Sequence, residues 1–213
     1  MGTTYRPLVI KYLSRTRTYT YKGIRLEIPP EVFHPGLFFS TKLLLRYLAK
    51  ENLSKKSFLE LGAGSGLLSI YAAQRGALAT ATDINPVAMD CIHTNAHDNG
   101  ADIVTIRSDV FDDIPKQRFD FMVINPPYYK KKPASFAEYA WYCGENGEYF
   151  QKFFGELDNY LHEHSVAIMV LCDGCDLEMI KNMARKNSFA LSCVQTQSTI
   201  IEKNFIFKIE RQE

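Results

Sequence analysis

The residues best suited to chemistry in this chain are Asn125-Pro126-Pro127-Tyr128, which directly follow the apolar run 119–124. That run is typical of a buried parallel strand. Because proline lacks a backbone N–H, the turn offers acceptors only: the Asn125 side-chain oxygen and the carbonyls beside Pro126. Such a set suits a planar –NH2 group, on which the ring of Tyr128 could stack. A strand that simply ends in a Pro-Pro turn would show the same pattern, so the upstream sequence must decide.

A strand, a glycine loop and a helix are predicted upstream of this turn. Residues 56–61 form a short apolar strand, residues 62–66 read Gly-Ala-Gly-Ser-Gly, and residues 67–73 follow a helical pattern. Glycines permit positive φ and close approach of a ligand, and the start of a helix supplies free N–H groups. The spacing differs from the G-x-G-x-x-G of nicotinamide enzymes, and Glu60 would meet a pyrophosphate with negative charge. We therefore expect a nucleoside-bearing, cationic ligand.

Two more predicted strands run into an acidic residue. Residues 78–82 precede Asp83, and residues 103–108 precede Asp109. At a strand's carboxyl end, Asp83 is placed to accept hydrogen bonds from both ribose hydroxyls, and Asp109 from an adenine amino group. Either residue alone could equally cap a helix. Together with Glu60, three acidic residues at equivalent positions of successive units favour ligand binding.

With these motifs the chain resembles class I S-adenosylmethionine-dependent methyltransferases that carry the N-P-P-Y signature of amino-group methylation, over roughly residues 31–209. The resemblance implies a Rossmann-like α/β fold with helices on both faces of a seven-stranded, mostly parallel sheet in the order 3-2-1-4-5-7-6. It also implies S-adenosyl-L-methionine as the cofactor. The strands and helices predicted beyond residue 36 alternate as such a fold requires. They include helices over residues 86–98 and 146–161 and a strand over residues 166–171.

The same resemblance implies a set of site residues. Those for the cofactor are Glu60, Gly62, Gly64 and Gly66 at the methionine end, Asp83 with Ile84 at the ribose, Asp109 with Val110 at the adenine, and Asn125; those for the target nitrogen are Asn125, Pro126, Pro127 and Tyr128. An amide or aryl-amine nitrogen is a poor nucleophile because its lone pair is delocalised. Accepting its N–H groups at Asn125 and Pro126 would favour the localised lone pair as attack begins. No strong base and no metal are expected.

Composition indicates one α/β domain, since 213 residues with 46% hydrophobic content can bury a sizeable core. We expect residues 1–36 to be a basic N-terminal extension with a β-hairpin around Lys22-Gly23, and residues 37–213 to be the methyltransferase domain. No apolar run could span a bilayer or serve as a signal peptide, which predicts a cytoplasmic protein without membrane contact. Five cysteines suit reduced thiols, and the Cys172-x-x-Cys175 pair lacks a second pair for zinc.

The substrate is predicted less sharply, with three alternatives. Asp83-Ile84-Asn85-Pro86 and Gly144-Glu145-Asn146-Gly147 resemble release-factor glutamine methyltransferases, which predicts a protein glutamine on a translation factor or ribosomal protein as the leading target. An RNA base amine, adenine N6 or guanine N2, is the second. Residues 1–56 hold 11 Lys+Arg against 3 Asp+Glu, and Lys130-Lys131-Lys132 could grip phosphates or form a solvated loop. The third is a non-catalytic adenosylmethionine-binding partner subunit.

Overall fold

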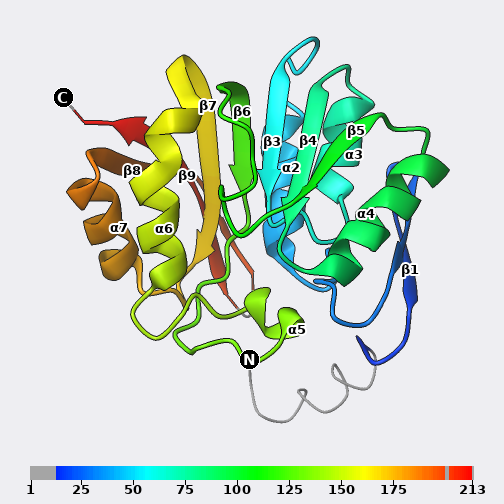
Figure 1. Cartoon of the computed structure of the whole chain (residues 1–213), viewed down its shortest axis with the longest axis horizontal. Helices are drawn as coiled ribbons and strands as arrows, with labels where there is room; N and C mark the ends of the chain where they lie inside the picture. Colours follow the sequence, from blue (N-terminus) through cyan, green and yellow to red (C-terminus); the bar gives the residue numbers. More distant parts are fainter. Residues whose placement is uncertain (1–12, 200–201, 213) are drawn as a thin grey trace.

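A seven-stranded sheet runs through the computed structural model, which describes residues 13–199 and 202–212 (Figure 1). Its strands are β3 (Ser57–Leu61), β4 (Leu78–Asp83), β5 (Ile103–Arg107), β6 (Phe119–Ile124), β7 (Leu161–Cys172), β8 (Phe189–Ser198) and β9 (Lys203–Arg211). The order is β5-β4-β3-β6-β7-β9-β8, and β9 alone runs antiparallel to both of its neighbours. Because the two hairpin strands come first in the numbering, this order confirms the predicted topology.

Helices cover both faces of the sheet and create two apolar cores. They are α2 (Phe39–Leu48), α3 (Leu67–Ala73), α4 (Pro86–Asp98), α5 (Phe136–Tyr139), α6 (Glu148–Glu156), the 3-10 turn η1 (Leu157–Tyr160) and α7 (Leu177–Lys186). Successive strand residues point to opposite faces, so Phe58 joins the core under α2 and α3 while Leu59 joins the core under α6 and α7. In Figure 1, α6 and α7 lie toward β8 and α4 lies toward β5. Burial on both faces explains why the strands read as continuous apolar runs.

The predicted hairpin is present as β1 (Arg17–Tyr21) and β2 (Ile24–Ile28), which pair antiparallel. The apolar residues of β2 are fully buried in the same core as α2 and α3. Asn95 of α4 fixes the hairpin: its Oδ1 accepts from Glu27 N at 2.8 Å, and its Nδ2 donates to Glu27 O at 3.1 Å and to Ser65 O at 3.0 Å. One buried amide therefore joins the hairpin to the glycine loop. Residues 1–12 of the basic extension lie outside the described residues.

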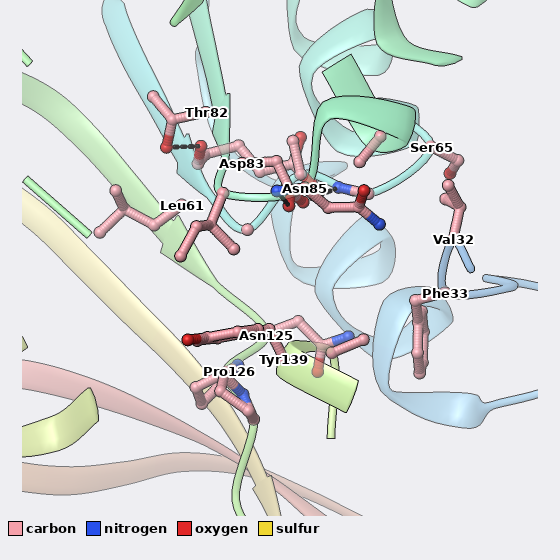
Figure 2. A pocket seen from close by; sticks show the side chains of 18 of the residues that line it. Val32, Phe33, Leu61, Ser65, Thr82, Asp83, Asn85, Asn125, Pro126 and Tyr139 are labelled. Atoms are coloured by element: carbon pink, nitrogen blue, oxygen red, sulfur yellow. Dashed lines mark hydrogen bonds between the residues drawn. The ribbon is translucent and has the colours of Figure 1, made fainter. Parts of the chain in front are cut away.

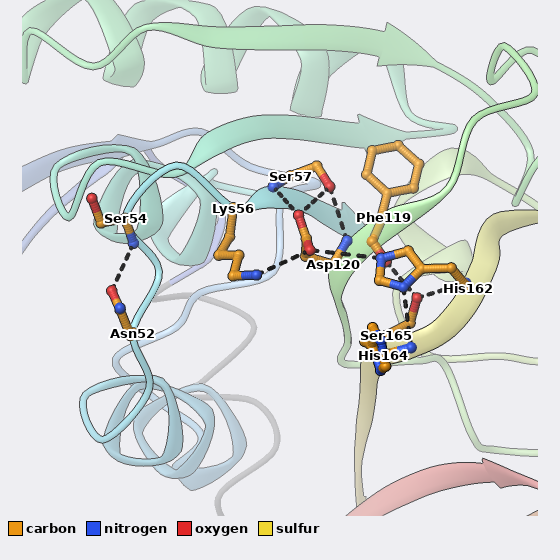
Figure 3. Close-up of polar contacts among 9 residues, drawn as sticks. All are labelled: Asn52, Ser54, Lys56, Ser57, Phe119, Asp120, His162, His164 and Ser165. Carbon is orange, nitrogen blue, oxygen red and sulfur yellow. Dashed lines mark hydrogen bonds and ion pairs between the residues drawn. The ribbon is translucent and has the colours of Figure 1, made fainter.

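A polar network ties together the first residues of β3, β6 and β7 (Figure 3). The backbone N–H and hydroxyl of Ser57 both donate to Asp120 Oδ2 at 2.9 Å. The other carboxylate oxygen, Oδ1, lies 3.3 Å from Lys56 Nζ and 3.6 Å from His162 Nε2. The backbone N–H of Ser57 is the largest cause of a lowered pKa at Asp120. The network lies at the amino ends of the strands and leaves their carboxyl ends free for the site.

Two predictions about local structure were wrong. The helix expected over 146–161 ends earlier, as α6 followed by η1, and β7 already begins at Leu161 rather than at Val166. Residues 162–165 are polar, so this part of the strand shows no apolar pattern in the sequence. The pairing of β7 with β6 is also irregular between Phe119 and Phe121. The short helix α5 was not predicted, because four residues are too few to show a helical period.

Within the described residues, no helix has both the length and the apolarity needed to cross a bilayer.

Candidate active site

A cavity lies at the carboxyl ends of β3, β4 and β6, where open α/β sheets bind their ligands. Every predicted site residue except Gly66 lines it. Figure 2 shows Asp83 and Asn85 on one side of this cavity and Asn125, Pro126 and Tyr139 on the other. The fold thus brings the glycine loop and the Asn-Pro-Pro-Tyr turn to face one space.

The glycine loop has a shape that only glycine adopts easily, with φ of 70° at Gly62, 55° at Gly64 and 78° at Gly66. Gly66 is the N-cap residue of α3 and does not line the cavity, and a Cβ there would lie 3.3 Å from Ile92. Since Gly66 has no side chain to cap the helix, Glu60 of β3 does so, accepting from Ser69 N at 2.8 Å and Ser69 Oγ at 2.6 Å. Burial raises the pKa of Glu60 to about 8, although the Ser69 hydrogen bonds lower it.

Asp83, at the end of β4, holds the glycine loop in place. Its Oδ2 accepts from Gly64 N at 2.9 Å, and its Oδ1 accepts from Asn85 N at 2.9 Å. Burial raises the pKa of this carboxyl, while the backbone donors act in the opposite direction. Each carboxylate oxygen has capacity for a second donor. Asp83 therefore presents acceptors to the cavity with its own position already fixed.

The residues after β5 combine an ion pair with a strained backbone. Asp109 Oδ2 lies 2.7 Å from Lys152 Nζ, which lies at the same distance from Asp112. Val110 has φ of 55°, a region that β-branched residues rarely adopt. The Ser108 hydroxyl donates to the Val110 carbonyl at 3.1 Å and helps to hold this conformation. Strained residues of this kind are concentrated at ligand sites, where the surrounding structure maintains them.

The Asn-Pro-Pro-Tyr turn is held from outside by the segment 141–144. The N–H groups of Tyr128 and Tyr129 donate to the Trp141 carbonyl at 3.2 and 3.0 Å, and Lys131 exchanges two 3.2 Å backbone hydrogen bonds with Gly144. The half-buried side chain of Asn125 has no hydrogen-bond partner among the described residues, so its acceptor and donors are available to the cavity. Burial raises the pKa of Tyr128, which stays a neutral phenol.

Aromatic side chains complete the cavity and were mostly missed from the sequence. Phe33, Phe136, Tyr139, Trp141 and Tyr149 all line it. The ring of Trp141 lies 5.4 Å from that of Phe33. Aromatic residues within predicted loops were the available signal, but they come from segments far apart in the chain. Their position favours a planar or apolar ligand group.

The lysines beside the turn are largely neutralised. Lys130 forms an ion pair with Asp176, and Lys131 Nζ lies 2.6 Å from Glu138. Lys131 also lies over the ring of Tyr142, at 4.6 Å from its centroid. Two of the three charges proposed to grip phosphates are therefore matched by carboxylates of the same molecule.

Comparison with known proteins extends this description. The family model described as "Methyltransferase small domain" matches residues 24–142. A putative protein N5-glutamine methyltransferase from Methanocaldococcus jannaschii is 36% identical over 68% of this chain and 74% of its own length. A tRNA1(Val) (adenine(37)-N6)-methyltransferase from Shewanella loihica is also 36% identical, but over 48% of this chain and 46% of that protein.

A solved structure agrees with the fold. The Mtq2-Trm112 complex of E. cuniculi superposes with a TM-score of 0.65 at 18% identity, covering 85% of this chain and 99% of the matched chain. This likeness confirms the Rossmann-like architecture. The family match begins at β2 and includes the glycine loop and the Asn-Pro-Pro-Tyr turn. The chain therefore belongs to the methyltransferase small domain family.

Proposed function

We propose that this protein transfers a methyl group from S-adenosyl-L-methionine to the side-chain amide nitrogen of a glutamine in a protein substrate. The observation that carries the proposal is the amide of Asn125, without a partner among the described residues, followed by two prolines and facing the cavity of the glycine loop. A glutamine amide is the small planar group that such a set of acceptors would hold. The similarity to a putative protein N5-glutamine methyltransferase supports this choice of target.

The cavity fits the cofactor by the chemistry of its donors and acceptors. Glu60 and the loop from Gly62 to Gly64 would hold the methionine end through hydrogen bonds, and Asp83 with Ile84 would hold the ribose. Asp109 would accept from the adenine amino group and the backbone of Val110 would meet the ring edge. Gly66 would serve by starting α3. When bound, the cofactor supplies an activated methyl group on a positively charged sulfur.

In the proposed mechanism the protein mainly aligns and polarises the target nitrogen. The Asn125 side-chain oxygen and the Pro126 carbonyl would accept its two N–H groups, since neither proline can donate. These bonds strengthen as the nitrogen loses its delocalisation, so they stabilise the transition state more than the ground state. One such preorganised group is typically worth about 2.7–4 kcal/mol. Pro127 and Tyr128 would fix the turn and cover the planar group.

An RNA base amine is the second candidate. The excess of 11 Lys+Arg over 3 Asp+Glu in residues 1–56 favours it, as does the likeness to a tRNA adenine-N6 methyltransferase. The carboxylate partners of Lys130 and Lys131 favour the protein substrate instead, because they reduce the positive charge next to the turn.

The proposal extends to partners and organisation. We propose a translation factor or ribosomal protein as the substrate and a cytoplasmic location. The E. cuniculi neighbour was solved as a two-protein complex that acts on a translation termination factor, which supports a possible partner subunit here. We further propose that residues 37–213 form the methyltransferase domain. The last residues of the N-terminal segment 1–36 would cover the cavity, since Val32, Phe33 and Pro35 line it.

The test is transfer of labelled methyl from S-adenosylmethionine into a lysate of cells that lack this protein, followed by separate RNase and protease digestion. We expect the label to be lost on protease digestion and retained after RNase. Loss on RNase digestion would establish the RNA substrate and overturn the glutamine proposal. Absence of label, with cofactor binding confirmed by calorimetry, would indicate a non-catalytic subunit or a missing partner.

A further inference from the structure

Two free thiols, those of Cys172 and Cys175, lie close to Tyr128 of the Asn-Pro-Pro-Tyr turn. Cys172 ends β7, and its Sγ lies 3.8 Å from Sγ of Cys175. The Cys172 backbone N–H donates to the Cys175 sulfur at 3.2 Å. On its other side, Cys172 lies close enough to the Tyr128 hydroxyl for this phenol to lower the pKa of the thiol. The proposed target site is therefore connected to a dithiol that the mechanism does not use.

The backbone already holds the two cysteines at a distance that a disulfide can bridge. Cys175 N donates to the Cys172 carbonyl at 3.1 Å, which closes a four-residue turn through Asp173 and Gly174. Residues at the ends of such a turn have Cα atoms less than about 7 Å apart, close to the range of disulfides. Bond formation thus requires side-chain rotation rather than refolding. Among the described residues, no group of three or more His, Cys, Asp or Glu side chains is placed to hold a metal.

The two thiols differ in pKa and in exposure. Cys172 is buried, and hydrogen bonds from Cys175, from the Gly174 backbone and from Tyr128 lower its pKa to about 7. The same interaction raises the pKa of Cys175, which keeps its proton and is partly exposed. A thiolate next to a protonated thiol is the arrangement found in reactive C-x-x-C pairs.

We propose that Cys172 and Cys175 form a reversible disulfide, and that its formation changes the surroundings of Tyr128 and slows transfer at the Asn125–Tyr128 turn. The regulatory part of this inference rests on the proposed function. The oxidant is a peroxide. The Cys172 thiolate attacks one peroxide oxygen, the O–O bond breaks, and hydroxide leaves as water, which gives a sulfenic acid. Cys175 then loses its proton and attacks the Cys172 sulfur, and a second water leaves. Two thiols are oxidised and the peroxide is reduced to two waters.

The disulfide can be detected without any methyl acceptor. Hydrogen peroxide is added to a Cys193→Ser protein, which lacks the exposed cysteine, and the product is alkylated and digested with trypsin. The peptide 153–181 contains both Cys172 and Cys175, whereas Cys143 lies in another peptide. We expect this peptide to lose two hydrogens and to resist alkylation until dithiothreitol is added. Added oxygen atoms, a link to Cys143, or a peptide that stays reduced would overturn the proposal.

The link to the site is read from Trp141, the only tryptophan of the chain, whose carbonyl accepts from the N–H groups of Tyr128 and Tyr129. Its fluorescence should change with disulfide formation and recover with dithiothreitol. Methyl transfer should fall roughly fivefold, the size expected for the loss of one weak polar contact. Cys172→Ser keeps a hydroxyl for Tyr128 but cannot be oxidised, so it should lose both responses to peroxide.

The possible outcomes separate this inference from the proposed function. A disulfide that leaves fluorescence and transfer unchanged would overturn the link to Tyr128. If the reduced protein transfers no methyl group at all, the proposed function fails, while the mass and fluorescence results still decide whether the dithiol closes and whether Tyr128 responds.

Discussion

The buried carboxyl of Glu60 predicts a distinct dependence of stability on pH. Its pKa rises from 4.5 to about 8 on folding, chiefly through burial. Between these values the native protein holds a proton that the unfolded chain has lost, so rising pH favours the unfolded chain. Each pH unit costs about 1.4 kcal/mol while the native group is protonated. From about pH 6 to about pH 8 the native pKa of about 8 gives a loss of roughly 2 kcal/mol in the free energy of unfolding.

The assay is urea unfolding of wild type and Glu60→Gln at these two pH values. Glutamine retains an oxygen that can accept from both Ser69 donors but cannot ionise. Asp83 also has a pKa raised by burial and is present in both proteins, and its charge contributes to the raised pKa of Glu60, so the difference between the two pH profiles reports the ionisation of Glu60 beside Asp83. We expect the variant to lose about 2 kcal/mol less than wild type over this range. Parallel profiles would show that Glu60 is already ionised in the native protein and would refute the reasoning.

Three further substitutions test the site and the contacts that stabilise the fold around it. Asp83→Ala removes acceptors for Gly64 and for the proposed ribose contact, so calorimetry should show at least about tenfold weaker cofactor binding; unchanged affinity would move that contact elsewhere. Asn95→Ala leaves both polar groups of Glu27 without their partner and should lower the free energy of unfolding by about 2–3 kcal/mol, and a neutral effect in urea unfolding would contradict the role of this amide. Asp120→Ala should cost about 1–2 kcal/mol at neutral pH and less near pH 3, because the lowered pKa of Asp120 gives stability that is lost as pH falls; an equal cost at both pH values would argue against it.

Much of the fold follows from local patterns in the sequence. The strand 119–124, the helix 67–73 and the helix from Pro86 to Asp98 were predicted with the bounds that the structure shows. Each of these elements has a clear boundary signal. The Pro-Pro turn follows the strand 119–124, glycine precedes the helix 67–73, and a proline begins the helix at Pro86. The start of β7 had no such signal, because residues 162–165 are polar and, before Val166, only Leu161 pairs with β6.

The candidate site divides in the same way. The loop and strand-end residues could be predicted because parallel strands deliver their carboxyl ends to one edge of the sheet. The contacts that hold them join segments far apart in sequence, such as Lys152 with Asp109 or Trp141 with Tyr128. The ion pair of Lys130 could not be predicted for the same reason, since its partner Asp176 lies between β7 and α7, far from Lys130 in the sequence. No local pattern reports such pairings.

The most direct test of the central claim compares methyl transfer by wild type and Asn125→Ala, with cofactor binding measured on both proteins. The half-buried Asn125 side chain has no hydrogen-bond partner among the described residues, so its removal should leave folding and cofactor affinity nearly intact. The account predicts that turnover falls by about 10²- to 10³-fold, which corresponds to the loss of one preorganised acceptor in the transition state. Turnover at the wild-type level would contradict the assignment of Asn125 to the target nitrogen.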